Sequence, residues 1–185
     1  MVLGVDPSIR ECGVVVVHDD HLVYRRTLRP DPHLPDSERL TWIGETIGTV
    51  AETLEVNAIG VEAQYAGAAR GNSLVKLAMC AGVVVGLGAW LGVPVYLVQP
   101  SEARAALGHG RMGKEQVHGA VRARLGLGDD YELTEHEAAA VAVALAAAGR
   151  QRWAEVLATG GVSGAGRRAA GKRQKAGRTG ALPTG

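Results

Sequence analysis

A run of 22 residues without a charged side chain, Leu77–Val98, restricts the folds open to this chain more than any other feature of its sequence. A run of this length is either a membrane span or a segment buried inside a soluble fold. Pro94 interrupts it, four glycines dilute it, and no cluster of basic residues marks one flank as an inside face. We therefore expect a buried helix followed by a short core strand, with no membrane contact.

The start of the chain and its cysteines predict the compartment. Met1 leads directly into the strand-like run Val2–Asp6, without the basic segment and cleavage site of a secretory signal. Cys12 and Cys80 lie in apolar surroundings without CxxC spacing, which argues against a disulfide framework or a thiolate zinc site. We expect two free core cysteines and a cytoplasmic protein.

The order of apolar patterns along the chain predicts an α/β fold. Three short β-branched runs come first, at 2–6, 14–18 and 22–28, with Asp19 and Asp20 forming the turn between the last two. Further strands are expected at 57–62 and 93–98, and helices at about 36–55, 72–91, 101–107, 113–125 and 134–149, capped by Asp36 or Ser37, by Ser101 and by Thr134. Together they predict a mixed five-stranded sheet, with three antiparallel strands followed by two parallel ones and helices on both faces.

Charge divides the chain into two parts. The net charge of +1 over 185 residues combines a tail at 167–185, with six basic and no acidic residues, and a remainder of net −5. We expect one domain over 1–152 and a basic tail over 153–185 that is disordered beyond 160. Because the body is mildly acidic, its overall charge does not by itself indicate nucleic-acid binding.

Two acidic residues end buried strands and are the first candidates for chemistry. Asp6 follows Gly4-Val5, and Glu62 follows Ile59-Gly60-Val61. Each could simply cap a loop at the end of its strand. On neighbouring strands the two carboxylates could instead hold Mg²⁺, which favours oxygen ligands and promotes phosphodiester cleavage.

Several motifs then occur in an order that resembles the RuvC family of Holliday junction resolvases over about residues 2–149. They are Asp6-Pro7 with Gly13, Glu62 with Tyr65, the segment 72–77, the segment 113–117 and His136–Val141. The resemblance implies a ribonuclease-H-like fold and a homodimer that nicks four-way DNA junctions symmetrically with Mg²⁺, for which Mn²⁺ can substitute. Branched DNA is the implied substrate, and branch-migration proteins are candidate partners.

The resemblance also implies roles for single residues. Asp6, Glu62 and His136 match positions of metal ligands, with Asp6 between two ions. Tyr65 matches an aromatic residue that touches bases, and Lys114 matches a basic residue that contacts DNA at the active site. From charge and position alone, Arg70, Lys76, Arg104 and Arg111 are further candidates for contact with phosphates, although a solvated charged face would explain them too.

The chain departs from the family pattern at the last motif, where Ala139 stands in place of a ligating aspartate. Three explanations are open. Glu135 lies one helical turn earlier on the same face and could supply a carboxylate to a shifted ion. Glu137 lies on another face, and as the third residue after Thr134 it fits a capping box. Alternatively, the ligand has been lost outright.

The last explanation leads to a second function, a catalytically impaired RuvC-like protein that binds branched DNA without efficient cleavage. A third, an actin-like ATPase or sugar kinase, also begins with a Gly-x-Asp hairpin. That class needs a second lobe to close over its nucleotide, and 185 residues leave no room for one.

Overall fold

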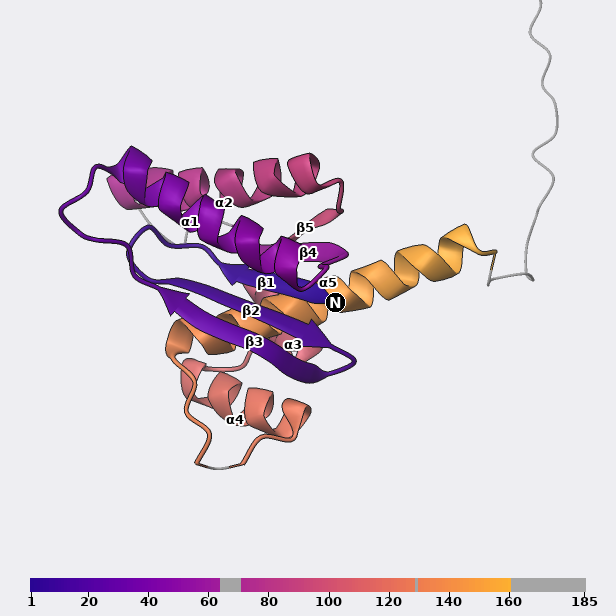
Figure 1. Cartoon of the computed structure of the whole chain (residues 1–185). Helices are drawn as coiled ribbons and strands as arrows, with labels where there is room; N and C mark the ends of the chain where they lie inside the picture. The colour runs from indigo at the N-terminus through magenta and orange to yellow at the C-terminus, as the bar shows by residue number, and fades with distance from the viewer. Residues whose placement is uncertain (64–70, 129, 161–185) are drawn as a thin grey trace, which may run out of the picture.

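The computed structural model describes residues 1–63, 71–128 and 130–160, and of Lys114 the backbone only. Within these residues one mixed sheet has the strand order β3-β2-β1-β4-β5 (Figure 1). Its strands are β1 (Val2–Asp6), β2 (Cys12–His18), β3 (His21–Leu28), β4 (Ala58–Glu62) and β5 (Val95–Val98). Pairing is antiparallel from β3 to β1 and parallel from β1 to β5. The predicted mixed sheet is confirmed.

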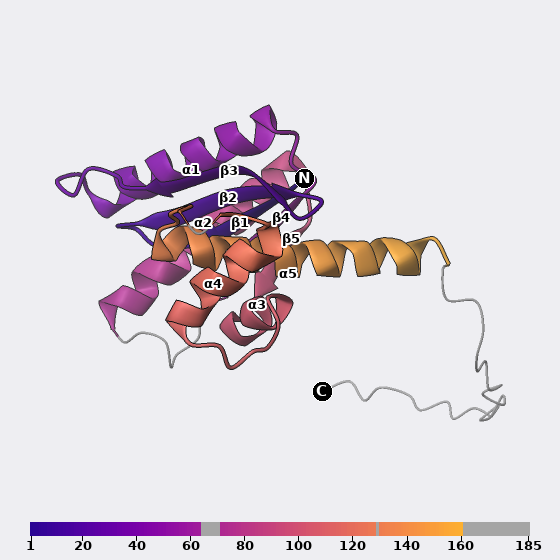
Figure 2. The same ribbon diagram turned by 90° about the horizontal axis from the view of Figure 1, so that it is seen from below.

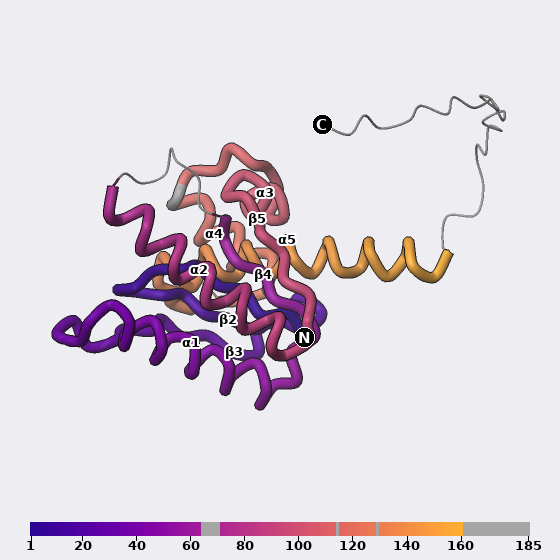
Figure 3. The backbone as a smooth tube through the Cα atoms, turned by 90° about the horizontal axis from the view of Figure 1, so that it is seen from above, coloured from indigo at the N-terminus to yellow at the C-terminus, as the bar shows by residue number. Residues whose placement is uncertain are grey.

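Helices cover both faces of this sheet, as expected. On one face lie α1 (Asp36–Thr53) and α2 (Asn72–Leu91), seen in front in Figure 3. On the other lies α5 (Glu135–Ala158), with α3 (Pro100–Ala106) and α4 (Lys114–Leu125) against it (Figure 2). Two apolar cores result, one on each side of the sheet.

Three sheet glycines let α5 lie almost directly on the backbone of the strands. A β-carbon added to Gly4 would overlap the carbonyl oxygen of Ala140, and one added to Gly13 would overlap that of His136. At Gly60 it would come within 2.7 Å of the Ala147 side chain. This close approach brings the first turn of α5 to the edge of the sheet where β1 ends and β2 begins.

The expected turn at Asp19 and Asp20 is present, and both residues have positive φ, as a tight hairpin requires. Two predicted caps are wrong. Helix α1 begins at Asp36 itself, after Pro35, and α3 begins at Pro100, whose fixed φ suits a first helical position. Neither start has a side-chain cap, whereas Thr134 caps α5 as predicted.

Two helices differ from expectation in length or burial. Helix α5 continues past Gly149 to Ala158. Directly after Gly149, the Arg150 side chain donates hydrogen bonds to Glu102 and to the carbonyl oxygen of Leu97, which support the helix at this point. Helix α2 was expected to be buried, but it packs mainly through Cys80, Val84 and Gly88 and leaves its outer face exposed. By length and composition α2 could cross a membrane, with a mean hydropathy of 2.0. Both cysteines are buried and free, as expected.

Candidate active site

The two candidate carboxylates lie side by side at one edge of the sheet. Strands β1 and β4 are parallel neighbours with Val5 opposite Val61, so Asp6 and Glu62 follow at the same level. Each residue is partly buried at the carboxyl end of its strand. Since the preceding residues of both strands are fully buried, the backbone that carries the two carboxylates is held firmly in place.

The start of α5 brings His136 to Asp6. The imidazole Nδ1 lies 2.7 Å from Asp6 Oδ2, and the other ring nitrogen, Nε2, lies 3.3 Å from Glu11 Oε2. Glu11 in turn accepts a 2.8 Å hydrogen bond from Arg29 Nε on the far side. Both ring nitrogens of His136 thus face carboxylates. Glu11, in the loop between β1 and β2, is a site neighbour that the sequence did not point to.

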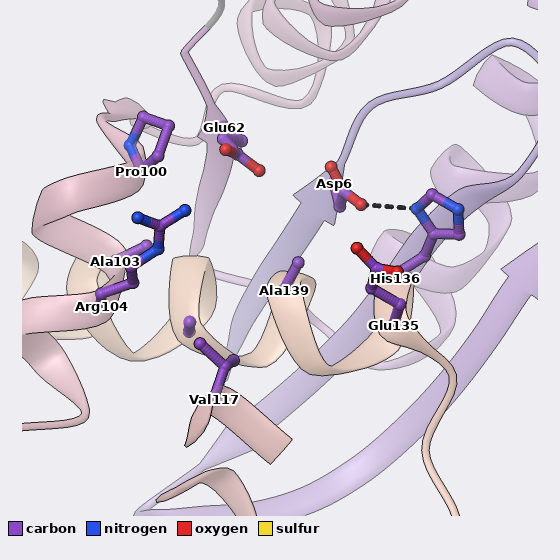
Figure 4. Close-up of a pocket in the computed structure, with 10 residues that line it drawn as sticks. Asp6, Glu62, Pro100, Ala103, Arg104, Val117, Glu135, His136 and Ala139 are labelled. Atoms are coloured by element: carbon purple, nitrogen blue, oxygen red, sulfur yellow. Dashed lines mark hydrogen bonds and ion pairs between the residues drawn. The ribbon is translucent and has the colours of Figure 1, made fainter. Parts of the chain in front are cut away.

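These side chains line a cavity of about 240 Å³ (Figure 4). Its polar lining comes from Asp6, Glu62, Arg104, Glu135 and His136, and its apolar lining from Pro100, Ala103, Val117, Ala139 and Ala142. In Figure 4 Ala139 and Glu135 rise from the same face of α5 toward Asp6, and Arg104 points from α3 toward Glu62. A negatively charged edge therefore faces one arginine across a small hollow.

Burial and charge shift the protonation of this edge. Burial, the negative charge of Asp6 and a hydrogen bond with Asp6 raise the pKa of Glu62 to about 7, while Arg104 acts in the opposite direction. The hydrogen bond with Asp6 raises the pKa of His136, against an opposing effect of burial. Without a cation, Glu62 therefore keeps its proton to a higher pH than an ordinary glutamate.

Three further predicted site residues lie just before α4, at its start and on α2. Arg111 is exposed in the loop before α4, and Lys114 is the first residue of α4. Lys76 forms a 2.8 Å ion pair with Asp36 at the start of α1 and does not line the cavity. Tyr65 and Arg70 lie outside the described residues.

The fit of the site to a metal depends on its donor atoms. Within the described residues no three His, Cys, Asp or Glu side chains are grouped closely enough to enclose an ion. Carboxylate oxygens are nevertheless the ligands that divalent cations such as Mg²⁺ prefer, and Asp6, Glu62 and Glu135 direct three carboxylates to one cavity. Burial and, after it, the negative charge of Asp6 raise the pKa of Glu62, and a bound cation would offset the repulsion between these two carboxylates. The donor chemistry fits a divalent cation.

The structure separates the acidic residues near Ala139. Ala139 lines the cavity, as does Glu135. Glu137 turns away from it and accepts a hydrogen bond from the backbone N–H of Thr134, while its own N–H bonds the Thr134 hydroxyl. The predicted capping box is confirmed. Of the two glutamates, only Glu135 faces the cavity.

A mixed sheet in this order, with acidic residues at the ends of its first and fourth strands and at the start of its last helix, defines a ribonuclease-H-like nuclease. The family described as Crossover junction endodeoxyribonuclease RuvC matches residues 2–147. The chain belongs to this family, whose members are nucleases that need a divalent metal.

Individual relatives agree. The RuvC of Leifsonia xyli is 32% identical over 171 residues, covering 89% of this chain and 81% of the relative. The structure of Thermus thermophilus RuvC in complex with a Holliday junction substrate superposes with a TM-score of 0.72 at 31% identity, covering 82% of this chain and 94% of that one. The yeast mitochondrial Holliday junction resolvase, at 15% identity and a TM-score of 0.51, covers 85% and 80% and shares the fold.

Proposed function

We propose that this chain resolves four-way DNA junctions by symmetric nicking as a homodimer, with Mg²⁺ as its natural cofactor and Mn²⁺ as a substitute. Its membership of the crossover junction endodeoxyribonucleases gives the class of reaction. The observation that carries the proposal for this chain is the cavity where Asp6, Glu62 and Glu135 converge opposite Arg104. Acidic metal ligands on one side of the cavity and an arginine on the other suit a phosphodiester that is held between a bound metal ion and the arginine.

Each residue of the site has its own proposed role in the reaction. Asp6, Glu62 and Glu135 would hold the metal, which when bound supplies the Lewis acidity that phosphodiester hydrolysis needs. His136 orients Asp6 through its 2.7 Å hydrogen bond, and it would bind the metal itself only by giving up its contact with Asp6 or with Glu11. Arg104 faces Glu62 across the cavity and is placed to attract a phosphate oxygen. To Lys114, the first residue of α4, we assign a contact with the DNA phosphate.

Glu135 is our candidate for the carboxylate that Ala139 lacks. Both residues line the cavity from the same face of α5, one turn apart. A glutamate is one methylene longer than an aspartate, which partly offsets the extra turn. The negative charge of Glu135 also reaches the site, since it contributes to the raised pKa of His136.

The dimer is proposed from the exposed face of α2. Val75, Met79, Gly82, Gly86 and Trp90 follow one another at intervals of three and four residues, and all are exposed. The exposed fractions of Val75 and Trp90, 57% and 73%, are large for apolar side chains. A second copy packed on this stripe would cover it, and Gly82 and Gly86 would allow the two helices to approach closely. Such a dimer carries two equivalent sites, as symmetric nicking requires.

This use of α2 leaves the protein free of the membrane, and we propose a cytoplasmic location. We also propose that Arg111, Lys76, Tyr65 and Arg70 contact junction DNA. No feature of the described residues identifies a surface for the expected branch-migration partners.

A second function, binding of branched DNA without efficient cleavage, is favoured by Ala139 alone. The deciding experiment incubates the full chain with a labelled four-way junction and Mg²⁺, Mn²⁺ or chelator. We expect paired nicks with metal and none with chelator, and we expect Asp6→Asn to bind the junction without nicking it. Tight junction binding by the wild type with no nicks in either metal would reject the nuclease in favour of the second function.

A further inference from the structure

Strand β3 is joined to the first turn of α5 by an ion pair between the buried Glu137 carboxylate and the partly exposed Arg25 guanidinium. Arg25 Nη1 donates a 2.8 Å hydrogen bond to Glu137 Oε2. Glu137 is only 5% exposed, so its charge is withdrawn from water, and burying an unpaired carboxylate would be unfavourable. Arg25 itself is held, since its Nε donates to the Tyr131 hydroxyl at 3.0 Å and its guanidinium stacks 4.9 Å from the centre of that ring.

Two threonines complete the connection. The Thr27 hydroxyl donates to Glu137 Oε1 at 3.3 Å, and the hydroxyl oxygens of Thr27 and Thr134 lie 2.6 Å apart. Thr134 is also the cap of α5. Arg25 and Thr27 of β3 thus both bond to Glu137, the third residue of the helix, and Thr27 also bonds to its cap, Thr134. Glu137 therefore takes part in the capping box of α5 and also bonds to two residues of β3.

These contacts lie next to His136, the residue that contacts Asp6. His136 directly precedes Glu137, and successive residues of a helix point in directions about 100° apart. With Glu137 fixed toward β3, the His136 ring lies against Asp6 and Glu135 faces the cavity. A small rotation of the first turn would move both side chains away from their partners.

The rest of α5 packs on the sheet without these contacts to β3. Nearly every residue from Ala138 to Ala148 is buried, and the close packing on Gly4 and Gly60 fixes the middle of the helix. An ion pair with one partner exposed to water adds little net stability compared with apolar packing, and the best supported use of a charged group at a buried position is to select one arrangement among several. Packing places the helix on the sheet, and the ion pair sets the angle of its first turn.

We propose that Arg25 and Glu137 are positioning residues, which fix the rotation of the first turn of α5 so that His136 and Glu135 face the metal-binding cavity. This inference rests on the proposed function. It predicts that loss of the pair weakens metal binding out of proportion to its effect on folding. Residues that support metal ligands typically change metal affinity by about 10–100-fold when removed.

The experiment compares three variants of the full chain. Arg25→Met removes the charge and keeps an unbranched apolar side chain that is shorter by the guanidinium group, and Arg25→Lys keeps the charge. Ile47→Val, in the core on the opposite face of the sheet, is the control, because it destabilises the fold by about 0.5–1.5 kcal/mol without touching α5. For each variant we would measure thermal unfolding, Mn²⁺ affinity by calorimetry, and the ¹⁵N chemical shifts of the His136 ring in metal-free protein.

We expect Arg25→Met to weaken Mn²⁺ binding about 10-fold and to shift the His136 ring signals, with Arg25→Lys partly restoring both. Ile47→Val should change neither. Equal losses of affinity in Arg25→Met and Ile47→Val at matched stability would overturn the positioning role. The His136 signals need no metal, so they test the positioning even if wild-type protein fails to bind Mn²⁺. Unchanged His136 signals in Arg25→Met would reject the inference, whereas the absence of Mn²⁺ binding by the wild type would reject the proposed function.

Discussion

His136 Nδ1 lies 2.7 Å from Asp6 Oδ2, and this hydrogen bond joins the last helix of the fold to its first strand. It links two residues 130 positions apart in sequence. The contact depends on α5 lying against the backbone of Gly13, where a side chain would strike the His136 carbonyl. The site is therefore a product of tertiary packing, and the predictions below test that packing and the chemistry it supports.

Restoring the missing carboxylate should raise activity. Ala139 lines the cavity with its methyl group, so Ala139→Asp would place a further oxygen ligand beside Asp6. We expect junction nicking with Mg²⁺ to increase about 10-fold or more, with little change in junction affinity. Ala139→Asn, of the same size but neutral, is the matched control. Cleavage rates and gel-shift affinities measured on one junction decide the matter, and equal rates for both variants would rule out a ligand at this position.

Glu62 should make the metal-free fold less stable at high pH. Its folded pKa of about 7 lies above its ordinary value of 4.5, so the folded state binds the proton more tightly than the unfolded state. Glu62 therefore lowers the stability of the wild type as pH rises from about 4.5 to 7, and this contribution is absent from Glu62→Gln. Because Glu62 is partly exposed, we expect the variant to be more stable by about 1–3 kcal/mol at pH 8 and equally stable at pH 4.

Urea unfolding in chelator across this pH range measures the effect of Glu62→Gln. The exposed Glu45→Gln on α1 is the control and should show no such pH dependence. A pH-independent difference between wild type and Glu62→Gln would contradict the shifted pKa.

A charge on the outer face of α2 should separate the proposed dimer. Met79 is 47% exposed at the middle of the apolar stripe, so Met79→Glu would place a carboxylate where the second copy is expected. Sedimentation equilibrium should find a monomer, and junctions should be nicked on one strand at a time. Thr41→Glu puts the same charge on an exposed position of α1 and should remain dimeric. A wild type that sediments as a monomer would remove α2 as a dimer surface.

The close approach of α5 to the sheet should not tolerate a methyl group. We expect Gly4→Ala to destabilise the fold by about 1–3 kcal/mol or more, because its β-carbon would overlap the Ala140 carbonyl. Gly119→Ala on α4 has open space around it and should stabilise by about 0.5–1 kcal/mol, since alanine favours a helix. Denaturant midpoints measured on both proteins test the pair, and a neutral Gly4→Ala would contradict the packing described.

The basic tail should contribute charge to DNA binding. Deleting residues 161–185 removes six positive charges, and phosphate contacts of this kind weaken steeply as salt rises. We expect folding to be unchanged and junction affinity to fall mainly at low salt. A salt series for the full and shortened chains measures this, and identical slopes of affinity against salt would exclude the tail from the interface.

The strands, the helix order and the strand-end carboxylates could be predicted because each leaves a local pattern. Val2–Asp6 and Ala58–Glu62 are apolar runs that end in an acid, and Thr134 with Glu137 spells a capping box. Glu11 and Arg25 could not be found this way, since their partners are more than 100 positions away. The exposure of α2 was missed because apolar composition does not distinguish a face that meets the sheet from one that meets another surface.

The site draws its acidic residues from the first strand, the fourth strand and helix α5. Because β1, β2 and β4 precede α5 in the chain, they leave the ribosome first and can pair, whereas Glu135 and His136 arrive only with α5. The cavity is therefore assembled last during synthesis. An incomplete nascent chain holds two carboxylates without the helix that completes their surroundings, so the ability to cut DNA is acquired only when the whole domain has been made and folded.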